Sequence, residues 1–180
     1  MRSALRWVMA AAFIILLGSP ARAQVTQPEL EKKLLPVGDP APDFDLPQVG
    51  GDRVRLSELT RKNVVLVTFW FYGCEACRTE FPHLQKMYDE LKARGLEVVA
   101  INAIDSRERI ESYQQEGKFT FRLLQAPRAD GQPVSEVVKK YRVSAYPTNY
   151  LIGKDGKVLA RFVGFNEKAV RDAIERAGVK

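Results

Sequence analysis

The sequence predicts an α/β domain in which helices cover both faces of a central sheet. Residues 63–71 (NVVLVTFWF) form a continuous apolar run rich in Val, Phe and Trp, which is typical of a strand buried on both faces. From residue 75 onward, apolar side chains recur every three or four positions, which is the spacing of a buried helix face. Strand-like and helix-like stretches then alternate along the chain, and this alternation indicates the α/β class.

The first 23 residues have the pattern of a secretory signal peptide. Two arginines precede an apolar run of about eleven residues (8–18), and Ala21 and Ala23 form an A-x-A cleavage pattern. The run is too short for a membrane span, which needs about 20 residues. We expect residues 1–23 to be removed, leaving a mature periplasmic or otherwise extracytoplasmic chain that begins at Gln24. An uncleaved membrane anchor is the alternative.

Charge and cysteine content exclude several classes of protein. The chain has 28 basic and 22 acidic residues, a net charge of +6, and loss of the three arginines of the signal would leave 25 against 22, or +3. No Lys/Arg block is present, so we expect no nucleic-acid binding. Two cysteines cannot build a multi-bridge secreted scaffold. We expect a monomer without a cofactor.

The N-terminal part of the mature chain is expected to hold an arm and a hairpin. Residues 24–36 contain two prolines, and we expect a flexible arm that leads into a domain over residues 37–180. Residues 42–46 (PDFDL) and 53–59 (RVRLSEL) are interpreted as two short extended pieces around a VGGDR turn.

Apolar periodicity and turn residues give the remaining elements in order. They are a helix over about 75–93 stopped by Gly95, a strand at 96–103, a helix at 106–117 with Ser106 as N-cap, a strand at 119–125, a helix at 133–143, a hairpin of 148–152 with 157–164, and a closing helix at 166–178.

Both cysteines lie where the first buried strand meets the first helix. A helix N-terminus offers unpaired N–H groups and a partial positive charge, and both favour a thiolate at Cys74. Cys77 lies one turn inside the helix and should be more buried. We therefore predict that Cys74 is the attacking nucleophile and Cys77 the resolving cysteine.

Two other interpretations of the Cys-x-x-Cys pair are weaker. A structural bridge across two residues closes a very short loop and restrains little unfolded-chain entropy. A zinc site needs about four protein ligands, or three and a water, whereas His83 is the only histidine in the chain. His83 fits a solvated helix face, so we expect no metal site. Redox exchange is the favoured interpretation.

Residues around the cysteines match a known pattern: a buried strand with Trp70, then Cys-Glu-Ala-Cys, Arg78, Glu80 and Pro82, and later SAYPTNYLI at 144–152. From about residue 37 to 177 the chain resembles the thioredoxin superfamily, in particular its exported TlpA-like or ResA-like branch. The resemblance implies a thioredoxin-like fold, with a central mixed sheet, helices on both faces and an added N-terminal β-hairpin.

The resemblance also implies a substrate-binding rim. It makes Tyr146–Pro147 a cis peptide that faces the cysteines, beside which an extended partner chain would bind. Gly73, Glu75 and Trp70 are expected to complete this rim. Family members usually carry Trp where this chain has Gly73, and many carry Pro where it has Ala76, so partner choice need not follow the relatives.

Glu80 is the candidate proton-handling group. Thioredoxin has a buried Asp in the strand before the motif, at the position of Thr68 here. Glu80 lies three residues after Cys77 and matches a family position that supplies an acid. Burial would raise its pKa. The alternative is a half-exposed, solvated helix acid.

The predicted function is an exported protein thiol–disulfide oxidoreductase that reduces chosen protein disulfides. The charge of Glu75 beside Cys74 opposes the helix dipole, which destabilises the thiolate and lowers the reduction potential. The resemblance implies cytochrome c maturation, with apocytochrome c as substrate, or oxidase copper-site assembly. A reductant in an oxidising compartment also needs a membrane electron donor.

Two other functions of the same fold are less favoured. A thiol peroxidase is favoured by PAPDFDL at 40–46, but it needs Thr three residues before the reactive cysteine, where this chain has Phe71. A copper-carrying binding protein would want Cys-x-x-x-Cys and a distant histidine, and no histidine follows His83.

Overall fold

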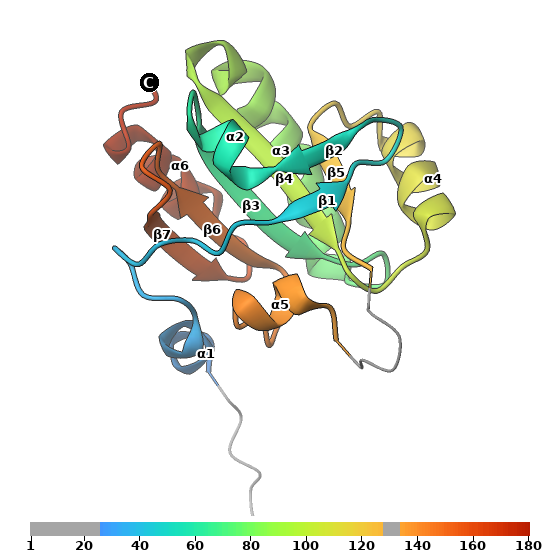
Figure 1. The fold of residues 1–180 in the computed structure, drawn as a ribbon, viewed down its shortest axis with the longest axis horizontal. Coiled ribbons are helices and arrows are strands. Elements are labelled where there is room, and N and C mark those ends of the chain that lie inside the picture. The colour runs from blue at the N-terminus through green and yellow to red at the C-terminus, as the bar shows by residue number, and fades with distance from the viewer. Residues whose placement is uncertain (1–25, 128–133) are drawn as a thin grey trace, which may run out of the picture.

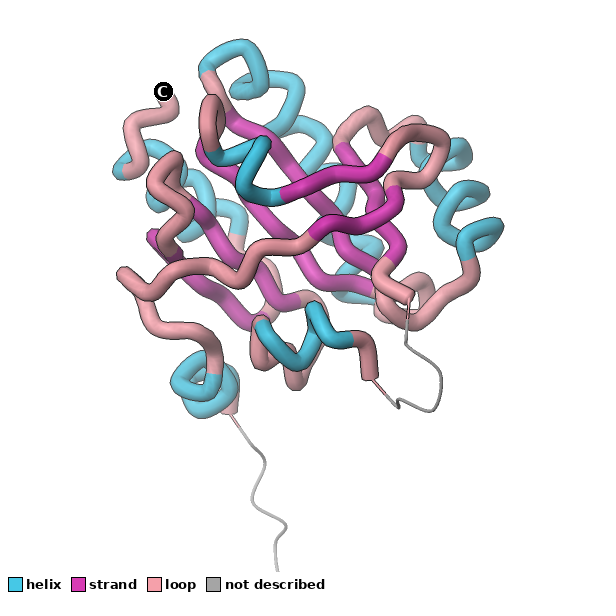
Figure 2. Tube along the Cα trace, viewed as in Figure 1, coloured by secondary structure: helices cyan, strands magenta, loops and turns pink. Residues whose placement is uncertain are grey.

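The central element is a five-stranded sheet (Figures 1 and 2). The computed structural model describes residues 26–127 and 134–180, so the predicted signal peptide at 1–23 lies outside the described residues. The strands lie in the spatial order β5 (Arg122–Gln125), β4 (Leu96–Asn102), β3 (Val64–Trp70), β6 (Thr148–Ile152) and β7 (Val158–Val163).

Strand directions make this sheet mixed, as predicted. β3 pairs in parallel with β4, and β4 in parallel with β5, whereas β6 runs antiparallel to both β3 and β7. Every residue of β3 and of β4 is buried, which explains their continuous apolar runs. The carboxyl ends of β3 and β4 therefore meet at one edge of the sheet, where both cysteines follow β3.

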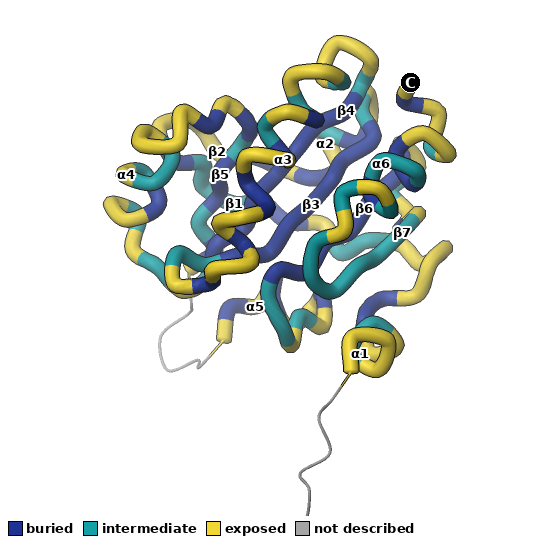
Figure 3. Tube along the Cα trace, turned by 180° about the vertical axis from the view of Figure 1, so that it is seen from behind, coloured by how far each residue is buried: buried dark blue, intermediate teal, exposed yellow. Residues whose placement is uncertain are grey.

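Helices cover both faces of the sheet. One face packs against α3 (Glu75–Leu91), α4 (Arg107–Gly117) and α6 (Glu167–Arg176), and Figure 3 shows this side. The other face is covered by the hairpin of β1 (Asp45–Pro47) and β2 (Arg53–Arg55), which crosses the front of the sheet in Figure 1, together with α2 (Leu56–Thr60) and α5 (Glu136–Lys140). The predicted N-terminal hairpin is confirmed.

The segment expected to be an arm contains a helix, α1 (Gln27–Lys33). Thr26 donates its backbone N–H to Glu29 Oε2 at 2.9 Å, which begins the helix in the manner of a capping box. Leu34 and Leu35 after the helix are buried, and the Arg161 guanidinium donates to both of their carbonyls, at 3.0 and 2.6 Å. The proline content pointed to an arm, but these long-range contacts attach the segment to β7.

The extended piece expected at 53–59 is also shorter than predicted, because α2 begins at Leu56. Asp43 Oδ1 accepts the Ser57 N–H at 2.9 Å, and Ser57 Oγ donates to Asp43 Oδ2 at 2.8 Å. These bonds satisfy donors of the first helical turn, a tertiary contact with no local signature.

The helix that follows the cysteines agrees with the sequence. α3 runs through Pro82 and passes into a short 3₁₀ turn, η1 (Lys92–Arg94), which Gly95 ends in the left-handed conformation at φ 96°. Within residues 26–127 and 134–180, no helix combines the length and apolar character that a membrane crossing requires.

Candidate active site

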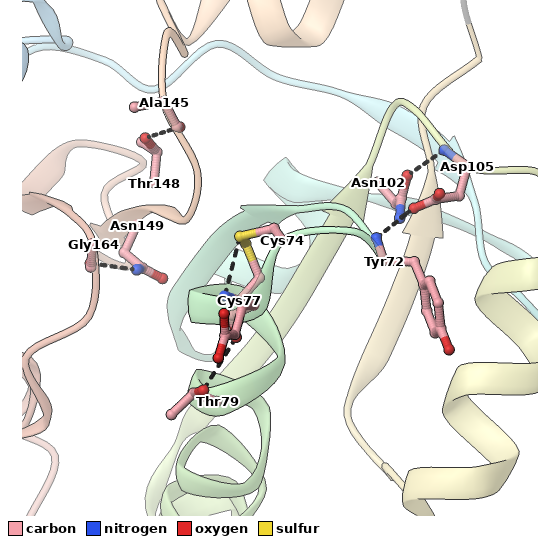
Figure 4. The surroundings of a disulfide bond; sticks show 11 residues. Tyr72, Cys74, Cys77, Thr79, Asn102, Asp105, Ala145, Thr148, Asn149 and Gly164 are labelled. Carbon is pink, nitrogen blue, oxygen red and sulfur yellow. Dashed lines mark hydrogen bonds between the residues drawn. A yellow bond between two sulfur atoms is a disulfide. The ribbon is translucent and has the colours of Figure 1, made fainter.

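The two cysteines form a disulfide at the start of α3. Cys74 is the N-cap residue of the helix, and its Sγ accepts the backbone N–H of Cys77 at 3.1 Å (Figure 4). A side-chain acceptor at this position satisfies one of the unpaired N–H groups of the first turn. In the reduced protein the same N–H and the helix dipole would favour a Cys74 thiolate.

Exposure separates the two sulfur-bearing residues. Cys74 keeps 9% of its surface accessible, whereas Cys77 is completely buried. This difference has the direction expected for an attacking and a resolving cysteine. The roles of attacking and resolving cysteine stay predictions, and kinetic measurement is their test.

A buried polar cluster lies under Cys77 between α3 and the sheet. Thr68 of β3 and Asn149 of β6 are paired directly across the two strands, and both are fully buried. Side chains alternate between the two faces along a strand, so Thr68 lies on the same face as Trp70, and Asn149 on the same face as Leu151. Trp70 and Leu151 pack in the core beneath α3, so Thr68 and Asn149 also point toward that helix. Glu80, also fully buried, meets them there.

Burial raises the pKa of Glu80 to about 8, while the polar side chains of Asn149 and Thr68 oppose that rise. Neither carboxyl oxygen has a hydrogen-bond partner among the described residues, and the same holds for Thr68 Oγ1 and Asn149 Oδ1. The Asn149 amide nitrogen donates to the Gly164 carbonyl at 3.3 Å, which leaves Oδ1 as a free acceptor (Figure 4). A protonated Glu80 has a donor suited to that acceptor.

The predicted raised pKa of Glu80 is thus confirmed, and the solvated alternative is wrong. Cys77 and Glu80 are three residues apart on one helix, so their side chains are neighbours on the same buried face. A carboxyl with a pKa of about 8 is present in both forms near neutral pH, so its carboxylate form can take up the proton of the buried thiol and its protonated form can release that proton again.

A second polar cluster holds the loop that precedes Cys74. Asp105 Oδ2 accepts the Tyr72 backbone N–H at 2.6 Å and the Asn102 side-chain amide at 2.7 Å (Figure 4). Asn102 Oδ1 in turn accepts the N–H groups of Ile104 and Asp105, each at 2.9 Å. The loop after β4 therefore fixes the backbone two residues before the reactive cysteine.

Sequence reasoning missed Asn102, Asp105 and Asn149. A signal was available for two of them, because Asn102 and Asn149 lie in strands in which every residue is buried, and a buried amide requires partners. Asp105 carried no such signal, since an acid in a loop is ordinary.

The predicted cis peptide Tyr146–Pro147 is confirmed. Pro147 immediately precedes β6, whose first residue pairs with Phe69, so this turn lies at the carboxyl end of β3. The Tyr146 ring contacts the Phe71 ring edge-on, with centroids 5.3 Å apart. This contact joins the proline turn to the loop before Cys74. A role in binding a partner chain stays a prediction.

The other predicted rim residues divide into two groups. Gly73 and Glu75 flank Cys74 and are exposed, and a Cβ at Gly73 would lie 3.1 Å from a Phe71 ring carbon. Trp70 was predicted to bind substrate, and this is wrong. Its side chain is fully buried, with ring centroids 4.5 Å from Phe81 and 5.2 Å from Tyr113, so it belongs to the core.

The only histidine of the chain, His83, already has side-chain partners at the protein surface. His83 Nδ1 lies 2.6 Å from Glu167 Oε2, and the His83 ring packs on Phe165. Across the part of the chain that the structure describes, no three His, Cys, Asp or Glu side chains are grouped so as to hold a metal ion.

These features together define a thioredoxin-like protein that performs thiol–disulfide exchange. They are a central mixed sheet, a disulfide at a helix N-terminus, a cis proline beside the neighbouring strand and a buried acid. The family model of the AhpC/TSA family matches residues 37–161, and the chain belongs to that family within the thioredoxin superfamily.

Relatives with similar sequences indicate a more specific activity. The chain is 33% identical over 143 residues to the thiol-disulfide oxidoreductase ResA of Bacillus subtilis, a match that covers 78% of this chain and 75% of ResA. It is 32% identical over 159 residues to ResA of Geobacillus kaustophilus, covering 88% and 87%.

Among solved structures, one assigned as a thiol:disulfide interchange protein DsbE from Chlorobium tepidum superposes with a TM-score of 0.71 at 33% identity, covering 79% of this chain and 98% of the other. The protein is a thiol–disulfide oxidoreductase that acts on protein disulfides.

Proposed function

We propose that this protein is an extracytoplasmic reductant of selected protein disulfides. The observation that carries the proposal is the unequal setting of the two cysteines, with Cys74 at an accessible helix start and Cys77 fully buried beside Glu80. An accessible nucleophile can meet a foreign disulfide, and a buried resolving cysteine can act only inside the complex.

The reaction proceeds in two exchanges. The Cys74 thiolate attacks one sulfur of the partner disulfide, and the other partner sulfur leaves as a thiolate. Cys77 then loses its proton to the Glu80 carboxylate and attacks Cys74 Sγ, which releases the second partner sulfur as a thiolate. The two partner thiolates take up one proton from Glu80 and one from water, so the partner gains two electrons and two protons, and the Cys74–Cys77 disulfide is the oxidised product.

The direction of electron flow is argued from charge. Glu75 is the first residue of α3 and is exposed beside Cys74, so its negative charge opposes the helix dipole at the sulfur. A less stabilised thiolate disfavours the reduced form and lowers the reduction potential. This favours a reductant.

We infer export from the sequence, and the need for an electron donor from the compartment. The pattern at residues 1–23 is that of a cleaved signal peptide, with a retained anchor as the alternative. In an oxidising compartment the reduced dithiol must be regenerated by a membrane electron donor. Apocytochrome c and a copper-site assembly protein are the proposed partner classes, from the resemblance, and we propose that the enzyme is a monomer.

Trapping and potentiometry test this function together. Exported Cys77→Ser protein should accumulate mixed disulfides through Cys74, and mass spectrometry of these complexes identifies the partners. The wild-type midpoint potential, measured against a thiol buffer, should be more negative than about −200 mV, below the value of about −180 mV typical of protein disulfide isomerase. A more positive potential would assign an oxidant or isomerase instead.

The two alternative functions have their own assays. Peroxide consumption at a rate above that of insulin reduction would favour the thiol peroxidase, although Phe71 occupies the position where that chemistry needs a threonine. Stoichiometric copper binding by the reduced protein would favour the copper carrier.

N-terminal sequencing tests the export proposal, because protein taken from the periplasm should begin at Gln24.

A further inference from the structure

Two arginines from different helices converge on one tyrosine beside the reactive cysteine. The guanidinium carbon of Arg109 lies 4.7 Å from the centroid of the Tyr72 ring, and that of Arg78 lies 5.7 Å from it. Arg78 is on α3 and Arg109 on α4, so Tyr72 lies between the two helices. We call Tyr72, Arg78 and Arg109 the cationic rim.

Both guanidinium groups are exposed, and within the described ranges neither forms an ion pair or a side-chain hydrogen bond. Arg171, on the opposite flank of α3, is by contrast paired with Glu90 and Glu167 at 2.8 and 2.7 Å. The donors of the cationic rim are thus available to an incoming anion, and guanidinium forks match carboxylates bidentately.

The cationic rim is held in place from below. Asp105 accepts the Tyr72 backbone N–H at 2.6 Å, and the Tyr72 ring packs edge-on against Tyr113, with centroids 5.7 Å apart. Tyr113 in turn contacts the buried rings of Trp70 and Phe81. A fixed ring orders both guanidinium groups before a ligand arrives, which lowers the entropy cost of binding.

We propose that the cationic rim is a specificity surface that binds acidic side chains flanking the target cysteine of a protein substrate. Tyr72 is two residues before Cys74, so a carboxylate bound at the rim belongs to a chain whose sulfur is within reach of the Cys74 thiolate. This position beside the reactive sulfur favours a protein substrate over a membrane lipid. The inference rests on the proposed function and names the substrate class.

Two matched peptides test it. Each has about ten residues and one internal disulfide, and its cysteines are flanked by three Glu in one peptide and by three Gln in the other. The second-order rate constant of reduction is measured for reduced wild type, Arg78→Gln, Arg109→Gln, the double variant and Lys86→Gln. Lys86 is exposed on α3 away from the rim, so Lys86→Gln controls for the loss of one positive charge.

The wild type should reduce the Glu peptide about five- to tenfold faster than the Gln peptide at low salt, because exposed charge pairs are individually modest and act together on association. The ratio of the two rates should fall about twofold to threefold in each single Arg variant, approach one in the double variant and remain at the wild-type value in Lys86→Gln. In 1 M salt the wild-type ratio should also approach one, because the Debye length is then about 3 Å and charges further apart than this are largely screened from one another.

A wild-type ratio of one at low salt, or an equal fall in Lys86→Gln and the Arg variants, would overturn the proposal. Binding of the wild type to vesicles of anionic phospholipid that the double variant loses, together with a peptide ratio of one, would assign the rim to a membrane surface instead. If wild type reduces neither peptide nor insulin, the proposed function fails; if it reduces both peptides equally, only this inference fails.

Discussion

The two cysteines belong to one helix turn but occupy electrostatically different regions. Around Cys74 the groups are exposed and charged, with Glu75 next to it in sequence and the cationic rim at the preceding loop. Around Cys77 the groups are buried and neutral, with Glu80, Thr68 and Asn149 enclosed between α3 and the sheet.

This difference determines how strongly each region can influence the chemistry. Charges near Cys74 are screened by water and salt, so each of them acts weakly and mainly affects which partner approaches. Charges near Cys77 are not screened, and a single carboxyl there has a large effect on proton transfer. We therefore propose that the outer region selects partners and that the inner region controls resolution.

The largest effect is expected from Cys74→Ser. Removing the more accessible of the two cysteines should reduce insulin reduction by about three orders of magnitude or more, because the predicted nucleophile itself is lost. Far-UV circular dichroism serves as the control for folding. Substantial residual activity in this variant would contradict the division of labour, since Cys77 would then be able to attack a foreign disulfide.

Cys77→Ser should block turnover to a similar extent but leave the first exchange intact. The variant should accumulate mixed disulfides, because the sulfur that resolves them is absent.

Alkylation of the reduced wild type should also modify Cys74 much faster than Cys77, given their exposures of 9% and 0%. Mass spectrometry of partly alkylated protein measures this, and equal rates would remove the basis of the comparison.

Glu80→Gln probes the inner region without removing a sulfur. The variant should resolve mixed disulfides about tenfold to a hundredfold more slowly, because Gln cannot take up the Cys77 proton. Its thiolate absorbance should titrate at lower pH than in wild type, since ionised Glu80 opposes a second nearby anion. Stopped-flow exchange and absorbance against pH measure the two effects. Superimposable curves would make Glu80 a merely structural buried acid.

The pH dependence of stability gives the same variant an independent check. The folded pKa of Glu80, about 8, lies above its unfolded value of 4.5, so the folded state binds more protons between these values. Wild-type stability should therefore decline as pH rises from about 4.5 to 8, by on the order of 4 kcal/mol from this one group. Urea unfolding of the oxidised protein should show this decline in wild type and not in Glu80→Gln.

Much of the inner region could be predicted from sequence because its determinants are local. The buried strand, the helix period and the Cys-x-x-Cys spacing fixed the positions of Cys74, Cys77 and Glu80 relative to one another. Local spacing could not show that Asn149 lies opposite Thr68, because that neighbourhood depends on strand pairing between residues 81 positions apart.

The errors have the same origin. Trp70 was expected at the substrate-binding rim, but both faces of its strand are covered and its side chain lies in the core. Helix α1 had a local signal, since Thr26 and Glu29 have the spacing of a capping box, but its attachment to β7 depends on Arg161, far along the chain. The cationic rim likewise needs α3 and α4 side by side, which no spacing within either helix indicates.

Asp105 fixes the loop of the outer region, and its replacement should have an intermediate effect. Asp105→Ala leaves the Tyr72 N–H and the buried Asn102 amide without an acceptor, which should cost about 1–3 kcal/mol of stability. Asp105→Asn retains an acceptor oxygen and should lose clearly less. Urea unfolding compares the two variants. An Asn variant as destabilised as the Ala variant would show that the charge, and not the hydrogen bonds, holds the loop.

The smallest effect is expected from Glu75→Gln, which changes only the outer region. Without the carboxylate the helix dipole acts unopposed on Cys74, so the thiolate is better stabilised and the reduced form is favoured. The midpoint potential should therefore rise, but by no more than about 20 mV, because Glu75 is exposed and water screens its charge. Equilibration of wild type and variant with a thiol buffer measures the shift at low salt and in 1 M salt, where it should largely disappear. A larger shift that persists at high salt would mean that the environment of Cys74 is as poorly screened as that of Cys77, and the contrast between the two cysteines would then lie in access alone.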